Sequence, residues 1–501
     1  MKTSVVISQE LLNQVGLPEV LQACHCRTPQ GKRLKNLTRF YTRATQDELL
    51  EELSAISYLA EMVKQKQPQV LEAQTQLSRL RELRGTFSRL EKGSLLDDTE
   101  LFELKSALTI FYRLSRLKKL LSAAGLGFQV TKDASALLDP AGTGNPAFHI
   151  YSDYSPELGL IRERKKELER EISLAKGYQR KTLLTKRALV TAEEDKLEEQ
   201  IRRQLGKKLV EWLPQMRHNA EICAILDFRL AKADLAVRWS GTQPAVVAGT
   251  EPAKLDNCRH PLIADMLEKQ GLHFTPISIT LQQGSTVLSG ANMGGKSVAL
   301  KSVFLALLMT QLGYFPICER LQTPLYDFMA FESSQDGDLD RGLSSFGFEC
   351  VQIRNHHRRS QTQNGLILMD EPCRGTNPAE ATAIVQALCR AYGTSSSTFL
   401  VATHYNVIPA EGIRFYQVRG IRPEALDELS DEQISTELDK YEDLTRVRKI
   451  QSLMDYRLDE IEGAHQIPSG AIKIAELLGV DEELLREMTA AWQEDQWLNS
   501  D

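Results

Sequence analysis

The chain has 501 residues, 42% of them hydrophobic and 26% charged, which is typical of a folded protein with room for two to four domains. Its 61 Lys and Arg against 67 Asp and Glu give a net charge of −6, so any contact with a polyanion must be local. The eight cysteines lack the paired spacing of a zinc site, and the sequence has no apolar run of about 18 residues. We therefore expect a reduced cytoplasmic protein rather than a secreted or membrane-spanning one.

The first part of the chain is predicted to be helical. Between residues 45 and 121, apolar side chains recur at intervals of three and four, as a helix face requires. The first members of this series are Leu49, Leu53, Ile56 and Leu59. Pro68, Gly85 and Gly93 are the helix breakers within the stretch. Turn-forming residues then fill positions 139–146, and the following Phe148–Tyr151 is short and β-prone.

A second helical region is predicted from Ser155-Pro156-Glu157, which has the order of an N-cap, a first-turn proline and an early acid. Residues 157–208 contain fifteen Lys and Arg against ten Asp and Glu, an excess of +5. Such a segment is most often a solvated helix with many ion pairs, and a nucleic-acid contact is the alternative. The basic residues we single out for that contact are Arg202, Arg203, Lys207 and Lys208. The outgoing helix is expected to turn back at Gly177 or near Val190-Thr191.

The pattern changes after about Arg238, where short β-prone runs alternate with helices. These runs are Ile277–Leu281, Thr286–Leu288, Leu366–Met369 and Phe399–Ala402. The alternation predicts an α/β domain with a mainly parallel sheet. Residues 424–443 contain nine acids and one lysine, which favours a solvated insertion or linker.

A glycine-rich loop follows the second of these runs. Residues 290–297, GANMGGKS, match G-x-x-x-x-G-K-[ST] between an apolar strand and a largely apolar helix. Backbone N–H groups and the helix N-terminus would surround a phosphate, Lys296 would reach the β- and γ-phosphates, and Ser297 would bind Mg²⁺. The residues expected to contact ATP are Gly290, Ala291, Asn292, Met293, Gly294, Gly295, Lys296, Ser297 and Val298.

Two further strand ends carry polar residues. Asp370 and Glu371 follow the run 366–369, and His404 lies two residues after the run 399–402. Phosphoryl transfer to water needs a carboxylate that holds the metal ion and a group that orients the attacking water. We expect Asp370 to hold Mg²⁺, Glu371 to polarise the water and His404 to donate to the γ-phosphate. The sequence therefore predicts an enzyme that hydrolyses ATP.

These segments carry a family resemblance. GANMGGKS, LILMDEPCRGTNPAE and VATHYNVI resemble the nucleotide-binding signatures of the MutS family in order and spacing. The resemblance implies a P-loop NTPase domain of the ABC type, preceded by an all-α core and lever domain. Residues 258–262 resemble the family's Arg-His-Pro element, which places His260 near the nucleotide. Phe274 stands where the family tends to place a residue against adenine.

The resemblance also implies a homodimer. Residues 343–349, LSSFGFE, resemble the segment that crosses the family's dimer and contacts the partner's nucleotide, although Leu343 replaces the usual arginine. Ser344 and Ser345 are therefore expected to act in trans. Residues 471–480 resemble the helical dimerisation element. The implied domains are a helical core (1–150), a shortened lever or clamp pair (151–237), the ATPase domain (238–465) and the dimerisation element (466–501).

The chain also departs from the family pattern. It lacks a Phe-x-Glu element in an N-terminal α/β domain, so we expect no direct mismatch reader, and we also expect no nuclease-like C-terminal domain. Residues 156–236 allow an out-and-back helical pair of about 40 residues, or about 60 Å, each. Residues 375–378 read Gly-Thr-Asn-Pro instead of Gly-Thr-Ser-Thr, which favours a divergent branch.

Two functions therefore stay open. In the first, ATP hydrolysis moves a helical arm on DNA, in the manner of mismatch repair but without mismatch reading. In the second, the same engine remodels a partner protein, as do the reactivating factors of cobalamin-dependent aminomutases, which shortened MutS-like ATPases resemble. The family resemblance and the +5 excess of residues 157–208 favour the first, whereas the acidic segment, the net charge and the shortened clamp favour the second. A catalytically silent scaffold is disfavoured because Lys296, Ser297, Asp370 and Glu371 are all present.

Overall fold

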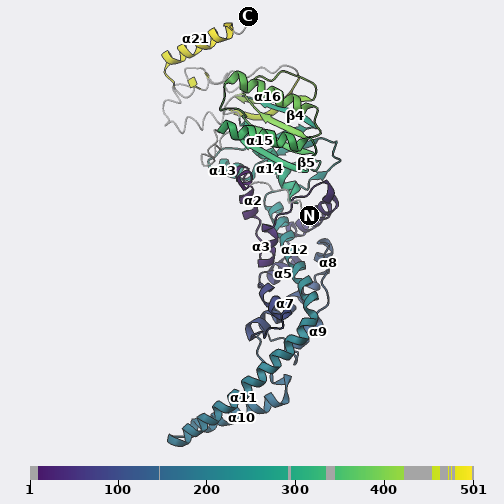
Figure 1. The fold of residues 1–501 in the computed structure, drawn as a ribbon, viewed down its shortest axis with the longest axis vertical. Helices are drawn as coiled ribbons and strands as arrows, with labels where there is room; N and C mark the ends of the chain where they lie inside the picture. Colours follow the sequence, from purple (N-terminus) through teal and green to yellow (C-terminus); the bar gives the residue numbers. More distant parts are fainter. Residues whose placement is uncertain are drawn as a thin grey trace. The chain divides into compact units, whose positions relative to one another are not determined.

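The computed structural model (Figure 1) describes residues 9–145, 147–290, 295–333, 345–421, 454–462, 472, 475–476 and 480–498. Its internal contacts divide the chain into two compact units. The helical unit comprises residues 24–38 and 54–237, and the α/β unit comprises residues 1–23, 39–53 and 238–501. Within the described ranges, no helix is both long enough and apolar enough to cross a membrane.

The helical unit confirms the predicted helical character of the first part of the chain. Its α-helices are most of α4 (Gln46–Lys64), α3 (Pro29–Asn36), α5 (Pro68–Leu77), α6 (Arg84–Glu91), α7 (Asp98–Ser115), α8 (Lys118–Ala123), α9 (Lys132–Leu138), α10 (Pro156–Leu174), α11 (Gly177–Leu209) and α12 (Leu213–Arg238). The predicted face residues Leu49, Leu53, Ile56 and Leu59 are all buried. Pro68 begins α5, and Gly93 lies just beyond α6, whereas Gly85 lies inside the first turn of α6.

The β-prone run 148–151 forms no strand. Its side chains are used differently: Phe148 and Ile150 pack in a small apolar cluster with Leu158 and Ile201. The Tyr151 hydroxyl accepts a hydrogen bond from Lys105 Nζ at 2.9 Å. β-propensity here reflects apolar and aromatic side chains that suit a half-buried surface, and helices supply that surface instead of a neighbouring strand.

A buried aspartate joins the first segment of the helical unit to its last helix. Asp227, on α12, accepts hydrogen bonds from the backbone N–H of Arg27 and Thr28 at 2.9 and 2.7 Å and from the Thr28 hydroxyl at 2.7 Å. Thr28 in turn caps α3 by accepting from Gly31 N–H. A Cβ on Gly31 would lie 2.4 Å from Asp227 Oδ2, so only glycine leaves room for this carboxylate.

Replacement of Asp227 with alanine is expected to destabilise the helical unit strongly. The substitution removes the acceptor of two backbone N–H groups, one of them fully buried, and of a buried hydroxyl; a buried donor costs about 1–3 kcal/mol when left unpaired. We expect the free energy of unfolding to fall by about 3 kcal/mol or more, measured by urea denaturation. The matched control is Asp133→Ala on α9, where the aspartate is exposed. Equal urea midpoints for the two variants would contradict this role.

Helices α10 and α11 form an antiparallel hairpin that we call the arm (Figure 1). The turn lies at residues 175–177, and Gly177 adopts the left-handed backbone (φ 61°) that favours glycine. Of the two predicted turning points, Gly177 is therefore right, and Val190-Thr191 lies within the continuous α11. The expected 40-residue arms are wrong: α10 has 19 residues, about 28 Å at 1.5 Å per residue.

The α/β unit contains two sheets. One has the order β1-β5-β2-β3, built from β1 (Ala245–Val246), β2 (Ala253–Cys258), β3 (Ile277–Leu281) and β5 (Arg320–Thr323). The larger sheet has the order β10-β9-β4-β8-β7-β6, built from β4 (Gly284–Ser289), β6 (Phe328–Ser333), β7 (Gly365–Asp370), β8 (Thr398–Ala402), β9 (Ile413–Ile421) and β10 (Met454–Ile461). All pairings in the larger sheet are parallel except β9 with β10, which confirms the predicted mainly parallel sheet.

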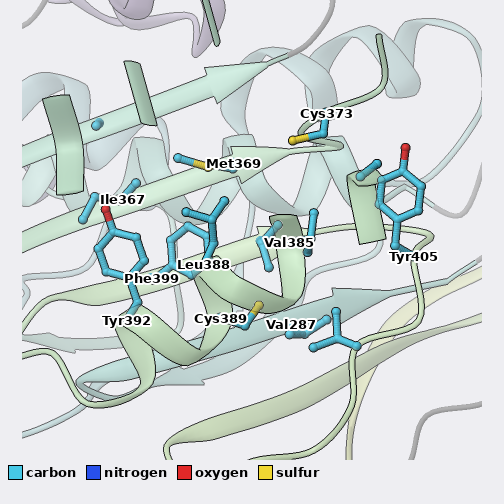
Figure 2. Close-up of a cluster of buried hydrophobic side chains, with 14 of the residues drawn as sticks. Val287, Ile367, Met369, Cys373, Val385, Leu388, Cys389, Tyr392, Phe399 and Tyr405 are labelled. Atoms are coloured by element: carbon cyan, nitrogen blue, oxygen red, sulfur yellow. The ribbon is translucent and has the colours of Figure 1, made fainter. Parts of the chain in front are cut away.

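Helices complete the α/β unit. They are α1 (Gln9–Gln14), α2 (Leu17–Ala23), α13 (Pro261–Lys269), α14 (Lys296–Gln311), α15 (Ser345–Ser360), α16 (Pro378–Gly393) and α21 (Glu482–Leu498). A core cluster lies between α16 and the larger sheet (Figure 2), where Val385 and Leu388 pack with Val287, Ile367 and Phe399. Strands β4, β7 and β8 are buried along their whole length. Strands β7 and β8 therefore contain the apolar runs 366–369 and 399–402, whereas β4 also buries Ser285 and Thr286.

Candidate nucleotide-binding site

The register of the large sheet brings the predicted site residues to one edge. Leu288 on β4 and Asp370 on β7 both pair with Ala402 on β8, which lies between them. The chain continues from these three aligned positions into the glycine-rich loop, the turn at Glu371 and the segment at His404. The carboxyl edge of a parallel sheet at such a crossover is the usual place for a ligand site in α/β proteins.

Only glycine fits at positions 290 and 295 of the glycine-rich loop. Gly290 has φ 147°, and a Cβ there would lie 3.1 Å from Val418. Gly295 has φ 79°, and a Cβ there would lie 2.7 Å from the ring of Tyr456 on β10. Ala291, Asn292, Met293 and Gly294 lie outside the described residues. Helix α14 then begins at Lys296, with Ser297 and Val298 in its first turn.

Lys296 is buried and faces the acidic turn after β7. Its Nζ donates to Gly290 O at 2.6 Å and lies 3.7 Å from Glu371 Oε1. Burial lowers the pKa of Lys296, while Glu371 and Asp370 raise it. The Lys296 ammonium thus lies between the Gly290 carbonyl and the Glu371 carboxylate, which is predicted to polarise the attacking water.

Asp370 provides a carboxylate oxygen that suits a cation. The residue is 5% exposed, and no described group donates a hydrogen bond to its Oδ1. Burial raises the pKa of Asp370, and a hydrogen bond from the Ser297 side chain lowers it. A buried oxygen without a donor is costly unless something else satisfies it, and carboxylate and hydroxyl oxygens are the donors that Mg²⁺ prefers. Ser297 and Asp370 therefore fit a magnesium ion.

Glu371 occupies an unusual backbone conformation. Its φ is 48° and that of Cys373 is 66°, two non-glycine residues in the left-handed region within one turn. Such conformations cost about 1–3 kcal/mol each and cluster at functional sites. The Glu371 N–H donates to Ala402 O at 2.9 Å, and Arg374 Nη1 lies 3.5 Å from Glu371 Oε2. The turn thereby aims the Glu371 carboxylate toward the start of α14.

His404 completes the group from β8. Its Nδ1 lies 3.9 Å from Glu371 Oε1 and is buried without a hydrogen bond to any described residue. Burial lowers the pKa of His404, opposed by Glu371. A neutral imidazole beside Glu371 can donate one N–H to a phosphate oxygen without adding a charge.

Of the other predicted site residues, the structure describes His260 and Phe274. His260 is the N-cap of α13: its Nδ1 accepts from Ile263 N–H at 3.4 Å, and its Nε2 lies 3.2 Å from Val15 O. Burial lowers the pKa of His260 to about 4. Phe274 is buried and lies in the segment that joins α13 to β3. Nucleotide contacts by these two residues stay predictions. Ser344 and the side chain of Ser345 lie outside what the structure describes.

Two residues of the site were not predicted from the sequence. Arg374 could have been found, because it is i+3 from Glu371. Tyr456 could not, since a β-strand distant in the sequence brings its ring to Gly295. A third residue, Glu349, was predicted only as part of a family resemblance, and it contacts the turn after β7.

Comparisons with known proteins match parts of this sequence. Residues 286–486 match the family model of MutS domain V. The chain is 27% identical to DNA mismatch repair protein MutS of Geobacillus thermodenitrificans over 57% of this chain and 32% of that protein. It is 28% identical to the MutS of Thermus aquaticus over 50% of this chain and 28% of that protein. It is 30% identical to Endonuclease MutS2 of Lacticaseibacillus casei over 40% of this chain and 25% of that protein. The matches thus span about a third or less of each relative.

Proposed function

Because this chain belongs to the MutS family, we propose that it is an ATPase that couples ATP binding and hydrolysis to movement of the arm on DNA. The observation that carries the ATPase proposal is the meeting of Lys296, Glu371 and the unsatisfied oxygen of Asp370 at one edge of the sheet. We further propose that the α/β unit is a P-loop NTPase domain of the ABC type. The domain boundaries given above remain part of this proposal.

Each site residue then has a chemical role. Lys296 neutralises the β- and γ-phosphates, and the N-terminus of α14 adds positive potential. Ser297 and Asp370 hold Mg²⁺, which supplies positive charge to the phosphates when it is bound. Glu371 orients and polarises the attacking water, and His404 donates to the γ-phosphate. We also propose a homodimer in which Ser344 and Ser345 contact the partner's nucleotide.

The arm carries its basic excess at its turn. Residues 172–192 contain five Lys and Arg and no acid, whereas the rest of the segment 157–208 has ten of each sign. We call residues 172–192 the arm tip. Away from the turn, the two helices of the arm are joined by ion pairs. Arg162 pairs with Glu194 at 3.0 Å and with Glu198 at 2.8 Å, and Lys165 pairs with Glu194 as well. The net charge of +5 therefore belongs to the arm tip.

This distribution changes the residues expected to contact DNA. Arg202 is paired with Asp98 at 2.8 Å and with Glu198 at 3.0 Å, and Arg203 is paired with Glu199 at 2.7 Å. These arginines already have anionic partners within the helical unit. In contrast, Lys176, Arg180, Lys181 and Lys186 are exposed, and none of them forms an ion pair with a described residue. Such unpaired cations at the arm tip are suited to contact phosphates.

Charge reversal at the arm tip is expected to weaken binding to duplex DNA. In the double variant Arg180→Glu/Lys181→Glu, the log–log salt slope should become shallower by about 1.8, or about 0.9 for each of two lost phosphate contacts. The matched control, Lys207→Glu/Lys208→Glu, makes the same charge change at exposed positions near the end of α11. It should bind nearly as the wild type does, as measured by fluorescence anisotropy across a salt series. Matched and mismatched duplexes should bind alike, because phosphate contacts do not read sequence.

A second candidate, a protein-remodelling ATPase, is favoured by apolar residues at the same place. Leu174 is 84% exposed and Tyr178 is 87% exposed, one on each side of the arm's turn. Exposed apolar and aromatic residues flanked by arginines are typical of protein interfaces. Equal weakening of DNA binding by both double variants, or no wild-type DNA binding at low salt, would reject the DNA-directed arm and favour this candidate.

A further inference from the structure

Glu349 connects α15 to the turn that carries Glu371. Its Oε1 accepts a hydrogen bond from Cys373 N–H at 2.8 Å, two residues beyond Glu371. Cys373 is one of the two left-handed residues of this turn. Burial raises the pKa of Glu349, and nearby Glu332 raises it further. The half-buried Glu349 carboxylate thus contacts a backbone N–H group of the turn that contains the two left-handed residues.

The end of β6 and the first turn of α15 both lie beside the turn that carries Glu371. Ser333 at the end of β6 pairs with Asp370 on β7. Helix α15 begins at Ser345, and Glu349 follows one turn later. The rest of α15 is fixed independently: Phe346 and Ile353 pack against the core cluster, and His356 Nε2 lies 2.7 Å from Glu332 Oε1. Glu349 is therefore not needed to hold α15 on the sheet.

We propose that Glu349 is a positioning residue for ATP hydrolysis, whose carboxylate holds Cys373 N–H and so keeps the left-handed turn that directs Glu371 toward the water. Through this bond, a displacement at the start of α15 changes the turn and hence the position of Glu371. This inference rests on the proposed ATPase function. It assigns Glu349 no contact with nucleotide, so its loss changes the rate of hydrolysis rather than the affinity for ATP.

The test compares two substitutions at Glu349 in the full chain. Glu349→Ala removes the acceptor, whereas Glu349→Gln retains an amide oxygen that can accept the same hydrogen bond from Cys373 N–H. The control is Cys350→Ala, the exposed neighbour of Glu349 on α15. Three quantities are measured for each variant: kcat from phosphate release, Kd for a fluorescent ATP analogue, and Tm.

We expect Glu349→Ala to lower kcat about tenfold or more, the effect of misplacing a group that must be oriented in the transition state. Its Kd should stay close to that of the wild type, and its Tm should fall only modestly, because a single backbone N–H loses its acceptor. Glu349→Gln should keep kcat within about threefold of the wild type, because the hydrogen bond is retained.

Three results would overturn the inference: an unchanged kcat in Glu349→Ala, a Gln variant as slow as the Ala variant, or a joint loss of Kd and Tm in Glu349→Ala. The last result would make Glu349 a purely structural residue. A wild-type chain that hydrolyses no ATP would instead overturn the proposed function, and this inference with it. The two failures are therefore told apart by the wild-type rate.

Discussion

Replacement of Glu371 with glutamine is expected to leave ATP bound while slowing its hydrolysis by about 10² to 10⁴-fold. A positioned base typically contributes a factor of this size, and the amide can neither accept the proton of the attacking water nor polarise it to the same degree. Affinity for ATP should persist, because Lys296 and the helix N-terminus are unchanged. The isosteric side chain also suits the same backbone conformation, with φ 48°.

The rate of phosphate release measures hydrolysis, and retention of radiolabelled ATP on a filter measures binding. Glu411→Gln is the control, since it makes the same chemical change at an exposed position between β8 and β9. Wild-type turnover by the Glu371→Gln chain would remove Glu371 from the reaction. Loss of retention without any change in turnover would be equally inconsistent with the assignment.

Replacement of Lys296 with alanine is expected to abolish tight ATP binding. Removing one partner of a buried, hydrogen-bonded charge pair costs about 2–5 kcal/mol, and 3 kcal/mol is a little over a hundredfold in Kd. The protein without nucleotide should change less, because burial lowers the pKa of Lys296 and its charge is itself unfavourable there. The defect should therefore appear mainly when ATP is present.

Thermal unfolding with and without Mg-ATP measures this difference directly. At a nucleotide concentration 100 times the wild-type Kd, binding stabilises the wild type by about 2.7 kcal/mol, whereas a hundredfold weaker variant gains only about 0.4 kcal/mol. Lys254→Ala on β2 is the control, since that lysine is exposed in the smaller sheet. An ATP-dependent rise in Tm that is the same in Lys296→Ala and Lys254→Ala would exclude Lys296 as a phosphate ligand.

The site could be predicted from the sequence where local patterns determine it. A glycine-rich motif follows β4, and polar residues stand at or just after the ends of the apolar runs in β7 and β8, so Lys296, Asp370 and His404 could be found without a structure. Their proximity follows from the parallel register at Ala402. A single motif and the general behaviour of parallel sheets were sufficient for this part.

Contacts between distant segments could not be predicted. Arg202 reads as a free cation in a charged helix, yet its partner Asp98 lies 104 residues earlier, on α7. The run 148–151 has the composition of a strand, but helices surround it. Glu349 and Cys373 are joined by a side chain and a backbone N–H, a contact with no sequence signature. Tertiary packing decided each of these cases.

The burial of the thiols has a practical consequence for spectroscopy. All eight cysteines lie within the described residues, and seven are buried, while Cys350 is exposed on α15. Burial raises the pKa of the Cys373 and Cys389 thiols to about 12, which keeps them protonated and unreactive toward maleimides near neutral pH. A dye can therefore be attached at one chosen position of the unaltered chain, beside Glu349. Its emission then follows α15 during a nucleotide cycle without any cysteine having to be removed.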